Sequence, residues 1–189
     1  MNSEKLTEES AYEAAEWELS EEYTRKVGSP GEIQADLVAL DKAAQCVIEG
    51  DMKPLERLSL GRICKCLAFS SAFDYSFEDE AGELVEDTDL FINVIKDHEI
   101  ACRALEKFLL NAAARAKTIC AQVYGELISI LTDFHFLDKT SDTVFDTPEL
   151  ASAFEGRMVS ALRKLWAENA VFVNIHSVHT QHPPSLKKG

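Results

Sequence analysis

SPGEIQADLVALDKAAQCVIEG, residues 29–50, carries the start, the body and the end of one helix in its sequence. Ser29 suits the N-cap, Pro30 suits the first helical position, and Glu32 can complete a capping box. Apolar residues then recur at spacings of four and three, namely Ile33, Leu37, Leu40, Ala44 and Val47. Gly50 supplies the residue that commonly ends a helix. The stretch therefore predicts an amphipathic helix between these two signals.

Similar signals mark helices on both sides of this stretch. Thr7 followed by two glutamates is typical of an N-cap, and Gly28 is placed to end a first helix that starts there. Pro54 opens a third helix that runs to about residue 73. Its apolar surface is broad, so we expect this helix to be central and buried on several sides.

The second half of the chain is also helical in pattern. Thr88 or Asp87 caps a run of apolar positions that continues without proline to Phe134. This run is longer than an ordinary helix, and we expect a break at Asn111. Pro148 opens the last helix.

Helix-to-helix packing is therefore expected throughout. The sequence predicts a single all-α bundle of five to six helices, mostly with antiparallel neighbours, over residues 1–176. Residues 177–189 are expected to form a polar tail. Strand signals are scarce: the one β-branched cluster, at 171–175, has no second strand with which to pair.

Composition and charge narrow the classes of function. Hydrophobic residues make up 46% of the chain, and the formal net charge is -14. Phosphate repels such a chain, so direct binding to nucleic acid or to an anionic membrane is disfavoured, and a basic protein partner is favoured. The charge can also serve solubility alone.

The compartment is expected to be the cytoplasm. The polar, acidic start of the chain lacks the features of a signal peptide, and no stretch reaches the length of a membrane span. The five cysteines, an odd number, all lie in apolar helical surroundings. We expect buried, reduced thiols rather than a disulfide framework.

Familiar catalytic and metal motifs are incomplete. The chain contains neither GxGxxG nor GxxxxGK[ST]. His98 and Cys102 lie four residues apart, as in a zincin helix, but on an apolar face and without an obvious third ligand. Cys64 and Cys66 are too close for a zinc knuckle. The sequence favours the absence of enzymatic activity and of a cofactor.

The acidic stretch 74–89 carries the alternative hypothesis, a Mg²⁺ site formed by Glu83, Glu86 and Asp89. The stretch does not match the calcium-binding loop of an EF-hand, because the glycine and the final glutamate of that loop are missing. Glu86-Asp87-Thr88-Asp89 resembles the ExxD half of the all-α nucleotide pyrophosphatases of the MazG type. The resemblance implies Mg²⁺-dependent hydrolysis of a phosphoanhydride. The preceding helix lacks that family's EExxE.

The N-terminal segment is the best candidate for a partner-binding surface. Eight glutamates fall within the first 22 residues. The candidate residues are Glu9, Glu13, Glu16, Trp17 and Glu21, in which an aromatic anchor lies among carboxylates. Trp17 can equally pack against a second helix of the same chain.

The C-terminal histidines His176, His179 and His182 raise the question of a second metal site. No carboxylate or cysteine accompanies them, so we expect weak binding of Ni²⁺ or Cu²⁺ at most. We expect this segment to be disordered. An alternative is that it folds back on the glutamate-rich first helix when the histidines are protonated.

The sequence as a whole favours a non-enzymatic, acidic protein-binding module, such as an adaptor, an inhibitor or an immunity-type protein. Its partner would carry a basic surface, as a nucleic-acid-binding protein does. Two alternatives stay open. One is the Mg²⁺-dependent pyrophosphatase, and the other is a self-assembling structural subunit, because heptad-like stripes can form an oligomer seam.

Overall fold

In the computed structural model, the helix at residues 29–50 begins and ends as its sequence predicts. α2 (Pro30–Glu49) carries the full capping box. The Ser29 hydroxyl accepts from the Glu32 N–H at 3.3 Å, and the Glu32 carboxylate accepts from the Ser29 N–H at 2.9 Å. Gly50 adopts the left-handed conformation, with φ 85°, that ends the helix.

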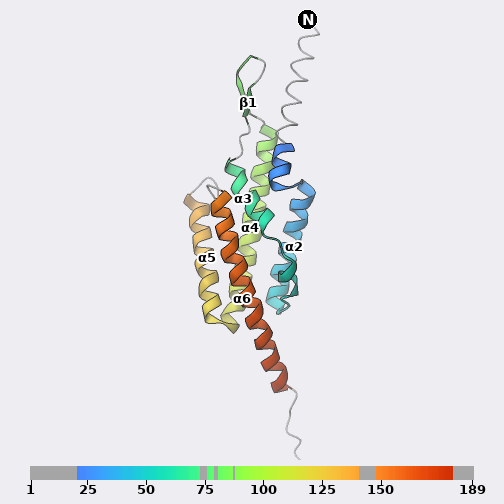
Figure 1. Ribbon diagram of the computed structural model, residues 1–189, viewed down its shortest axis with the longest axis vertical. Helices are drawn as coiled ribbons and strands as arrows, with labels where there is room; N and C mark the ends of the chain where they lie inside the picture. Colours follow the sequence, from blue (N-terminus) through green and yellow to red (C-terminus); the bar gives the residue numbers. More distant parts are fainter. Residues whose placement is uncertain (1–20, 73–75, 79–80, 87, 141–147, 181–189) are drawn as a thin grey trace, which may run out of the picture.

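The chain is an all-α helical bundle with one short β-hairpin (Figure 1). The structure describes residues 21–72, 76–78, 81–86, 88–140 and 148–180, with side chains at 21–68, 81–84, 98–136 and 149–177. Residues 21–27 are helical. The elements that follow α2 are the 3₁₀ helix η1 (Lys53–Arg57), α3 (Gly61–Ala72), β1 (Ser76–Glu78), β2 (Leu84–Glu86), α4 (Thr88–Ile119), α5 (Ala121–Thr140) and α6 (Pro148–Thr180).

α2 and α4 pack side by side and run in the same direction. Lys107 pairs with Asp41, and the Asn111 side chain donates to the Ala44 carbonyl at 3.2 Å. The two residues of the first contact are 66 positions apart in the chain, and those of the second are 67 positions apart. A nearly constant separation along two helices means that they run parallel. This pair differs from the mostly antiparallel arrangement that we expected.

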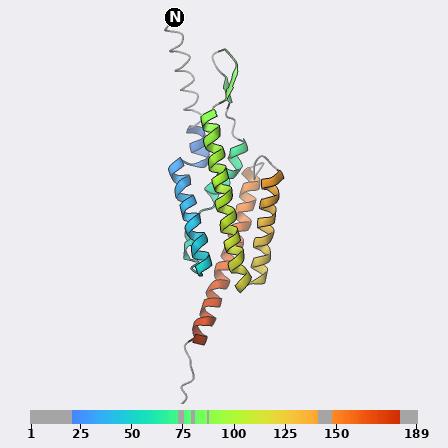
Figure 2. The same ribbon diagram turned by 180° about the vertical axis from the view of Figure 1, so that it is seen from behind.

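α4, α5 and α6 follow one another in alternating directions (Figures 1 and 2). Between α5 and α6, Arg157 pairs with Asp133 at 2.7 Å, and Lys164 pairs with Glu126 at 2.8 Å. The later residue of α6 thus meets the earlier residue of α5, as antiparallel helices require. Short connections favour this arrangement of sequential neighbours.

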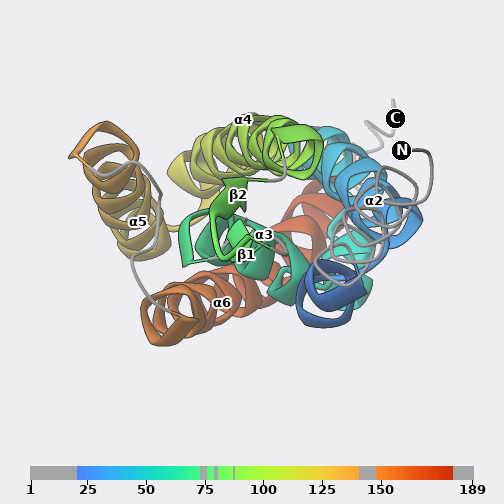
Figure 3. The same ribbon diagram turned by 90° about the horizontal axis from the view of Figure 1, so that it is seen from above.

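α3 lies between α4, α6 and α2 when the bundle is seen from above, as its broad apolar surface predicts (Figure 3). Its Ile63, Cys66 and Leu67 are almost completely buried. The largest fully buried side chains around it include Leu40, Leu105, Phe108, Leu127, Phe134, Met158 and Leu165. Each such side chain stabilises the fold by about 1.5–3 kcal/mol relative to an exposed position.

The region around Pro54 differs from the prediction of one helix over residues 54–73. Pro54 lies in η1, Leu58 is extended, and α3 begins only at Gly61. Ser59 and Gly61 interrupt the apolar run, and both residue types favour non-helical backbone over the interior of a helix.

The break in the long helical run lies at Cys120, and our prediction of a break at Asn111 is wrong. The Asn111 side chain bonds to α2, so it does not compete for the backbone of its own helix. Near the observed break, the Thr118 hydroxyl donates to the Arg115 carbonyl at 2.8 Å. Such a local bond, next to β-branched residues, weakens helical continuity.

Part of the acidic stretch forms a hairpin, which the sequence did not predict. Ser76 pairs with Glu86, Phe77 with Val85, and Glu78 with Leu84, in antiparallel register. Gly82 has φ 76°, which suits a tight turn. Few strand signals are visible in the sequence because each strand has only three residues.

The two ends of the described chain refine the predicted boundaries. Residues 21–27 form a helix that ends at Gly28, as predicted, and Tyr23 and Val27 are buried. At the other end, α6 continues to Thr180 and so includes four residues that we had assigned to the tail. His176 and His179 therefore lie on a helix, while His182 is outside the described residues.

Candidate functional site

The predicted partner-binding residues lie at one end of the bundle as far as the structure describes them. Glu21 is exposed on the helical segment 21–27. The Tyr23 hydroxyl contacts the Cys66 thiol at 3.8 Å and so fixes this segment against α3. Glu9, Glu13, Glu16 and Trp17 lie outside the described residues.

The candidate Mg²⁺ ligands are distributed over the hairpin and the start of α4. Glu83 is exposed in the turn before β2, Glu86 ends β2, and Asp89 lies in the first turn of α4. The side chains of the last two are outside those described. No group of three or more metal-ligating side chains occurs among the residues that the structure describes.

His98 and Cys102 are both half-buried on α4. Cys102 packs against the hydrophobic core. Within the described ranges no third ligand gathers beside the pair. Their positions thus agree with the apolar face on which the sequence places them.

The cysteines are all free thiols, as predicted. Cys64 and Cys66 are buried, while Cys46, Cys102 and Cys120 are half-buried. Burial, and to a lesser extent the nearby Glu155 carboxylate, raises the pKa of Cys64 to about 12. Cys64 is therefore a protonated, unreactive thiol at neutral pH.

The acidic residues of the chain are concentrated in two segments. Residues 1–22 contain eight acidic residues and one lysine, and residues 74–97 contain nine acidic residues and one lysine. Together they hold 17 of the 33 acidic residues but only two of the 19 basic ones. The remainder of the chain is close to neutral. We call these two segments the acidic pole.

The described parts of the acidic pole meet at one end of the molecule. The helical segment 21–27, the hairpin and the first turns of α4 all lie at the end opposite the end of α6 (Figures 1 and 2). This segment contributes Glu21 and Glu22 to the acidic pole, and Lys26 of the same segment pairs with Glu22 at 2.6 Å. Two segments that are far apart in the sequence therefore have described residues at the same end of the bundle. The sequence indicates both segments, but only the topology brings them together.

Acidic residues in the middle of the bundle are mostly paired across helices. Arg62 of α3 bonds to Asp36 of α2 at 3.0 Å, and Lys107 of α4 pairs with Asp41. These partly exposed pairs contribute little to stability, on the order of 1 kcal/mol each at most. The pairs matter more for the electrostatic field of the surface, because each pair neutralises a negative charge locally.

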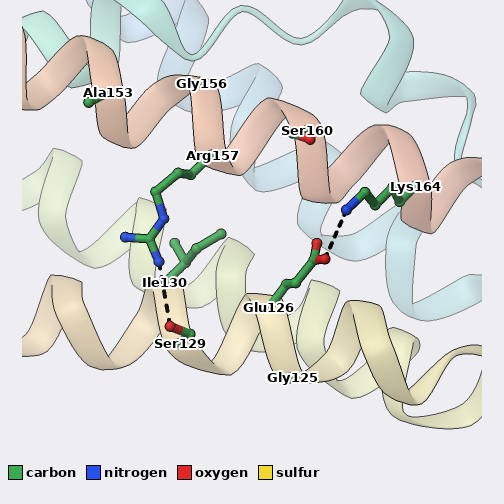
Figure 4. Close-up of a pocket in the computed structure, with 9 residues that line it drawn as sticks. All are labelled: Gly125, Glu126, Ser129, Ile130, Ala153, Gly156, Arg157, Ser160 and Lys164. Carbon is green, nitrogen blue, oxygen red and sulfur yellow. Dashed lines mark hydrogen bonds and ion pairs between the residues drawn. The ribbon is translucent and has the colours of Figure 1, made fainter.

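A groove of about 680 Å³ separates α5 from α6 (Figure 4). Small side chains open it: Gly125 and Ser129 on α5, and Ala153, Gly156 and Ser160 on α6. Figure 4 shows Arg157 and Lys164 reaching across toward α5. Both cations already pair with carboxylates of that helix. The groove therefore lacks the unpaired charge that an anionic ligand would need.

A second groove, of about 540 Å³, lies between η1 and α6. We call it the Trp166 groove. Its lining is mainly apolar and comprises Leu55, Glu56, Leu58, Leu60, Val159, Leu162, Arg163, Trp166 and Ala167. With one acid and one base, it has no net charge. It differs in this respect from the acidic pole.

Comparison with protein families, with curated proteins and with solved structures found no match. Among the described helices, none is long and apolar enough to cross a membrane. Function must therefore be inferred from the surface of this chain itself.

Proposed function

We propose that this protein is a non-enzymatic protein-binding module that engages a basic partner through its acidic pole. The supporting observation is the segregation of charge: the acidic excess lies in two segments whose described parts share one end of the bundle. Opposite charges that face each other accelerate association and select the partner.

The kind of partner follows from this chemistry. A surface of many carboxylates with few cations presents charge in the manner of a nucleic-acid backbone. It therefore suits a protein whose basic cleft binds nucleic acid. Such binding makes the module an adaptor or an inhibitor, according to whether the partner's cleft stays active when occupied. An immunity-type role is the special case in which that partner is a toxin.

The experiment is capture of partners from the native host by the full chain, at low and at high salt. At 0.15 M ionic strength charges interact over about 8 Å, and at 1 M over about 3 Å. We expect a basic partner to be captured at low salt and released at high salt. A partner whose binding is insensitive to salt, or the absence of any basic protein at low salt, contradicts the proposal.

Two matched variants locate the binding surface. The pole variant combines Glu83→Gln, Glu86→Gln and Asp89→Asn. The control variant combines Glu49→Gln, Asp51→Asn and Glu168→Gln, at exposed positions away from the pole and from the Trp166 groove. Both remove three negative charges, so they change the net charge equally. Only the pole variant is expected to weaken capture.

A further inference from the structure

The C-terminal part of α6 projects beyond the bundle. Asn169 is the last buried residue among the described side chains of this helix, and it donates to the carbonyl of Gly50, which ends α2, at 3.2 Å. The helix nevertheless continues to Thr180. At 1.5 Å per residue, the projecting part is about 16 Å long. Figures 1 and 2 show it extending away from the other helices.

The projecting part carries apolar side chains that contact little of their own chain. Val171, Val173 and Ile175 are 56%, 47% and 53% exposed. β-branched residues are poor helix formers, and helices shorter than about 12 residues are marginal in water. Packing against another surface would therefore stabilise this part of α6, and of the three residues only Val173 lies on the same face of the helix as Trp166.

One face of α6 continues from the Trp166 groove onto the projecting part. Val159, Trp166 and Val173 follow one another at intervals of seven residues, which places them on one face of the helix. Trp166 is 40% exposed although it lines the groove. We call these three residues the α6 seam.

The α6 seam is complementary to itself. If two α6 helices pair in antiparallel fashion about Trp166, Val159 of one copy lies opposite Val173 of the other. The projecting part of each copy then lies in the Trp166 groove of the other, beside Leu55 and Leu58. Symmetry of this kind is the rule for homodimers, in which both copies contribute the same surface.

Charge permits a second copy to bind at this end of the molecule. Residues 169–177, NAVFVNIHS, contain no aspartate, glutamate, lysine or arginine, and the groove that would receive them has no net charge. Pairing at this end also holds the two acidic poles at the far ends of the assembly. Other contacts between two copies of a chain with a net charge of -14 would bring like charges closer together.

We propose that two copies of the chain form a symmetric, antiparallel dimer through the α6 seam, with Trp166 at the two-fold axis. The dimer presents one acidic pole at each end. Such a molecule can engage two basic surfaces at once, and binding to a repetitive partner gains avidity without any new contact. The dimer does not depend on the identity of that partner.

The test is the mass of the full chain in solution, measured by light scattering and by sedimentation equilibrium over a range of concentrations. We expect twice the chain mass of 21.0 kDa. Val173→Glu, in the seam, should weaken the dimer at least about 100-fold, because a carboxylate would be buried in an apolar interface. Val171→Glu is the matched control, because Val171 lies on another face of the same exposed helix.

Fluorescence of Trp166 provides a second readout that does not depend on mass. In a Trp17→Phe background, we expect dilution of the dimer to shift the emission to longer wavelength as Trp166 becomes hydrated. Val173→Glu should show the long-wavelength emission at every concentration, and circular dichroism should show that it remains helical.

Three outcomes would overturn the proposal. The first is a mass of 21.0 kDa up to concentrations on the order of 10⁻⁴ M, a Kd too weak for a specific dimer. The second is a dimer that Val173→Glu leaves intact, which would place the interface elsewhere. The third is that Val171→Glu and Val173→Glu weaken the dimer equally, which would show that the α6 seam is not the contact between the two copies.

Discussion

Replacement of Asn169 by alanine tests how α6 is fixed to the bundle. Asn169 is only 5% exposed and joins three helices. Its side-chain oxygen accepts from Nε and Nη2 of Arg115 of α4, at 2.9 and 2.5 Å, and its side-chain nitrogen donates to the carbonyl of Gly50 at 3.2 Å. Alanine removes all three bonds and leaves a partly buried guanidinium and a carbonyl without this partner.

The expected loss follows from these contacts with two groups, the Arg115 guanidinium and the Gly50 carbonyl. A hydrogen bond to a charged group contributes about 1.5–3 kcal/mol, and a neutral one about 1 kcal/mol. Alanine has a higher helix propensity than asparagine, which offsets about 0.5 kcal/mol of this loss. We therefore expect the free energy of unfolding to fall by about 2–3.5 kcal/mol, and Tm by about 4–14 °C in a chain of this size.

The assay is urea denaturation followed by circular dichroism, with every variant at the same protein concentration. Asn174→Ala is the control, because Asn174 is exposed on the same helix and should change stability by less than about 0.5 kcal/mol. Asn169→Asp keeps an acceptor for Arg115 but cannot donate to Gly50, so it should fall between the two. Equal stability of Asn169→Ala and Asn174→Ala would refute this role.

Two further predictions concern chemistry rather than packing. The pKa of Cys64 is raised from its ordinary value of 9.0 to about 12, so above pH 9.0 the unfolded chain releases a proton that the folded chain retains. The free energy of unfolding should then fall by about 1.4 kcal/mol per pH unit up to pH 12. In urea titrations, this fall should be shallower for Cys64→Ala than for the unchanged chain. Equal slopes would contradict the raised pKa of Cys64. Mg²⁺ with a nucleoside triphosphate should leave Tm unchanged, whereas the pyrophosphatase alternative requires a rise in Tm that Asp89→Asn abolishes.

Local signals predicted most helix boundaries of the bundle. The capping box at Ser29, the glycines at residues 28 and 50, and the proline at residue 148 act through neighbouring backbone groups, which a sequence displays directly. The break at Cys120 could not be found in this way. Asn111 is held in its helix by a carbonyl 67 positions earlier, and a contact of that range depends on the packed fold.

The surfaces were predicted less completely than the fold. The sequence indicated two acidic segments, but it could not indicate that residues 21–27 and the hairpin share one end of the bundle. It also predicted that α6 would end near His176, because its apolar pattern weakens there. The continuation to Thr180 exposes Val173 and Ile175, and amphipathic periodicity does not reveal whether a face packs against its own chain or against another.

The most direct test of the proposed function is the dissociation constant of the captured partner for the pole variant and for the control variant. Each neutralised charge at an exposed contact should cost about 0.5 kcal/mol, so we expect the pole variant to bind roughly tenfold more weakly at physiological salt. The control variant should bind like the unchanged chain. Equal dissociation constants for the two variants would contradict the claim that the acidic pole carries the binding.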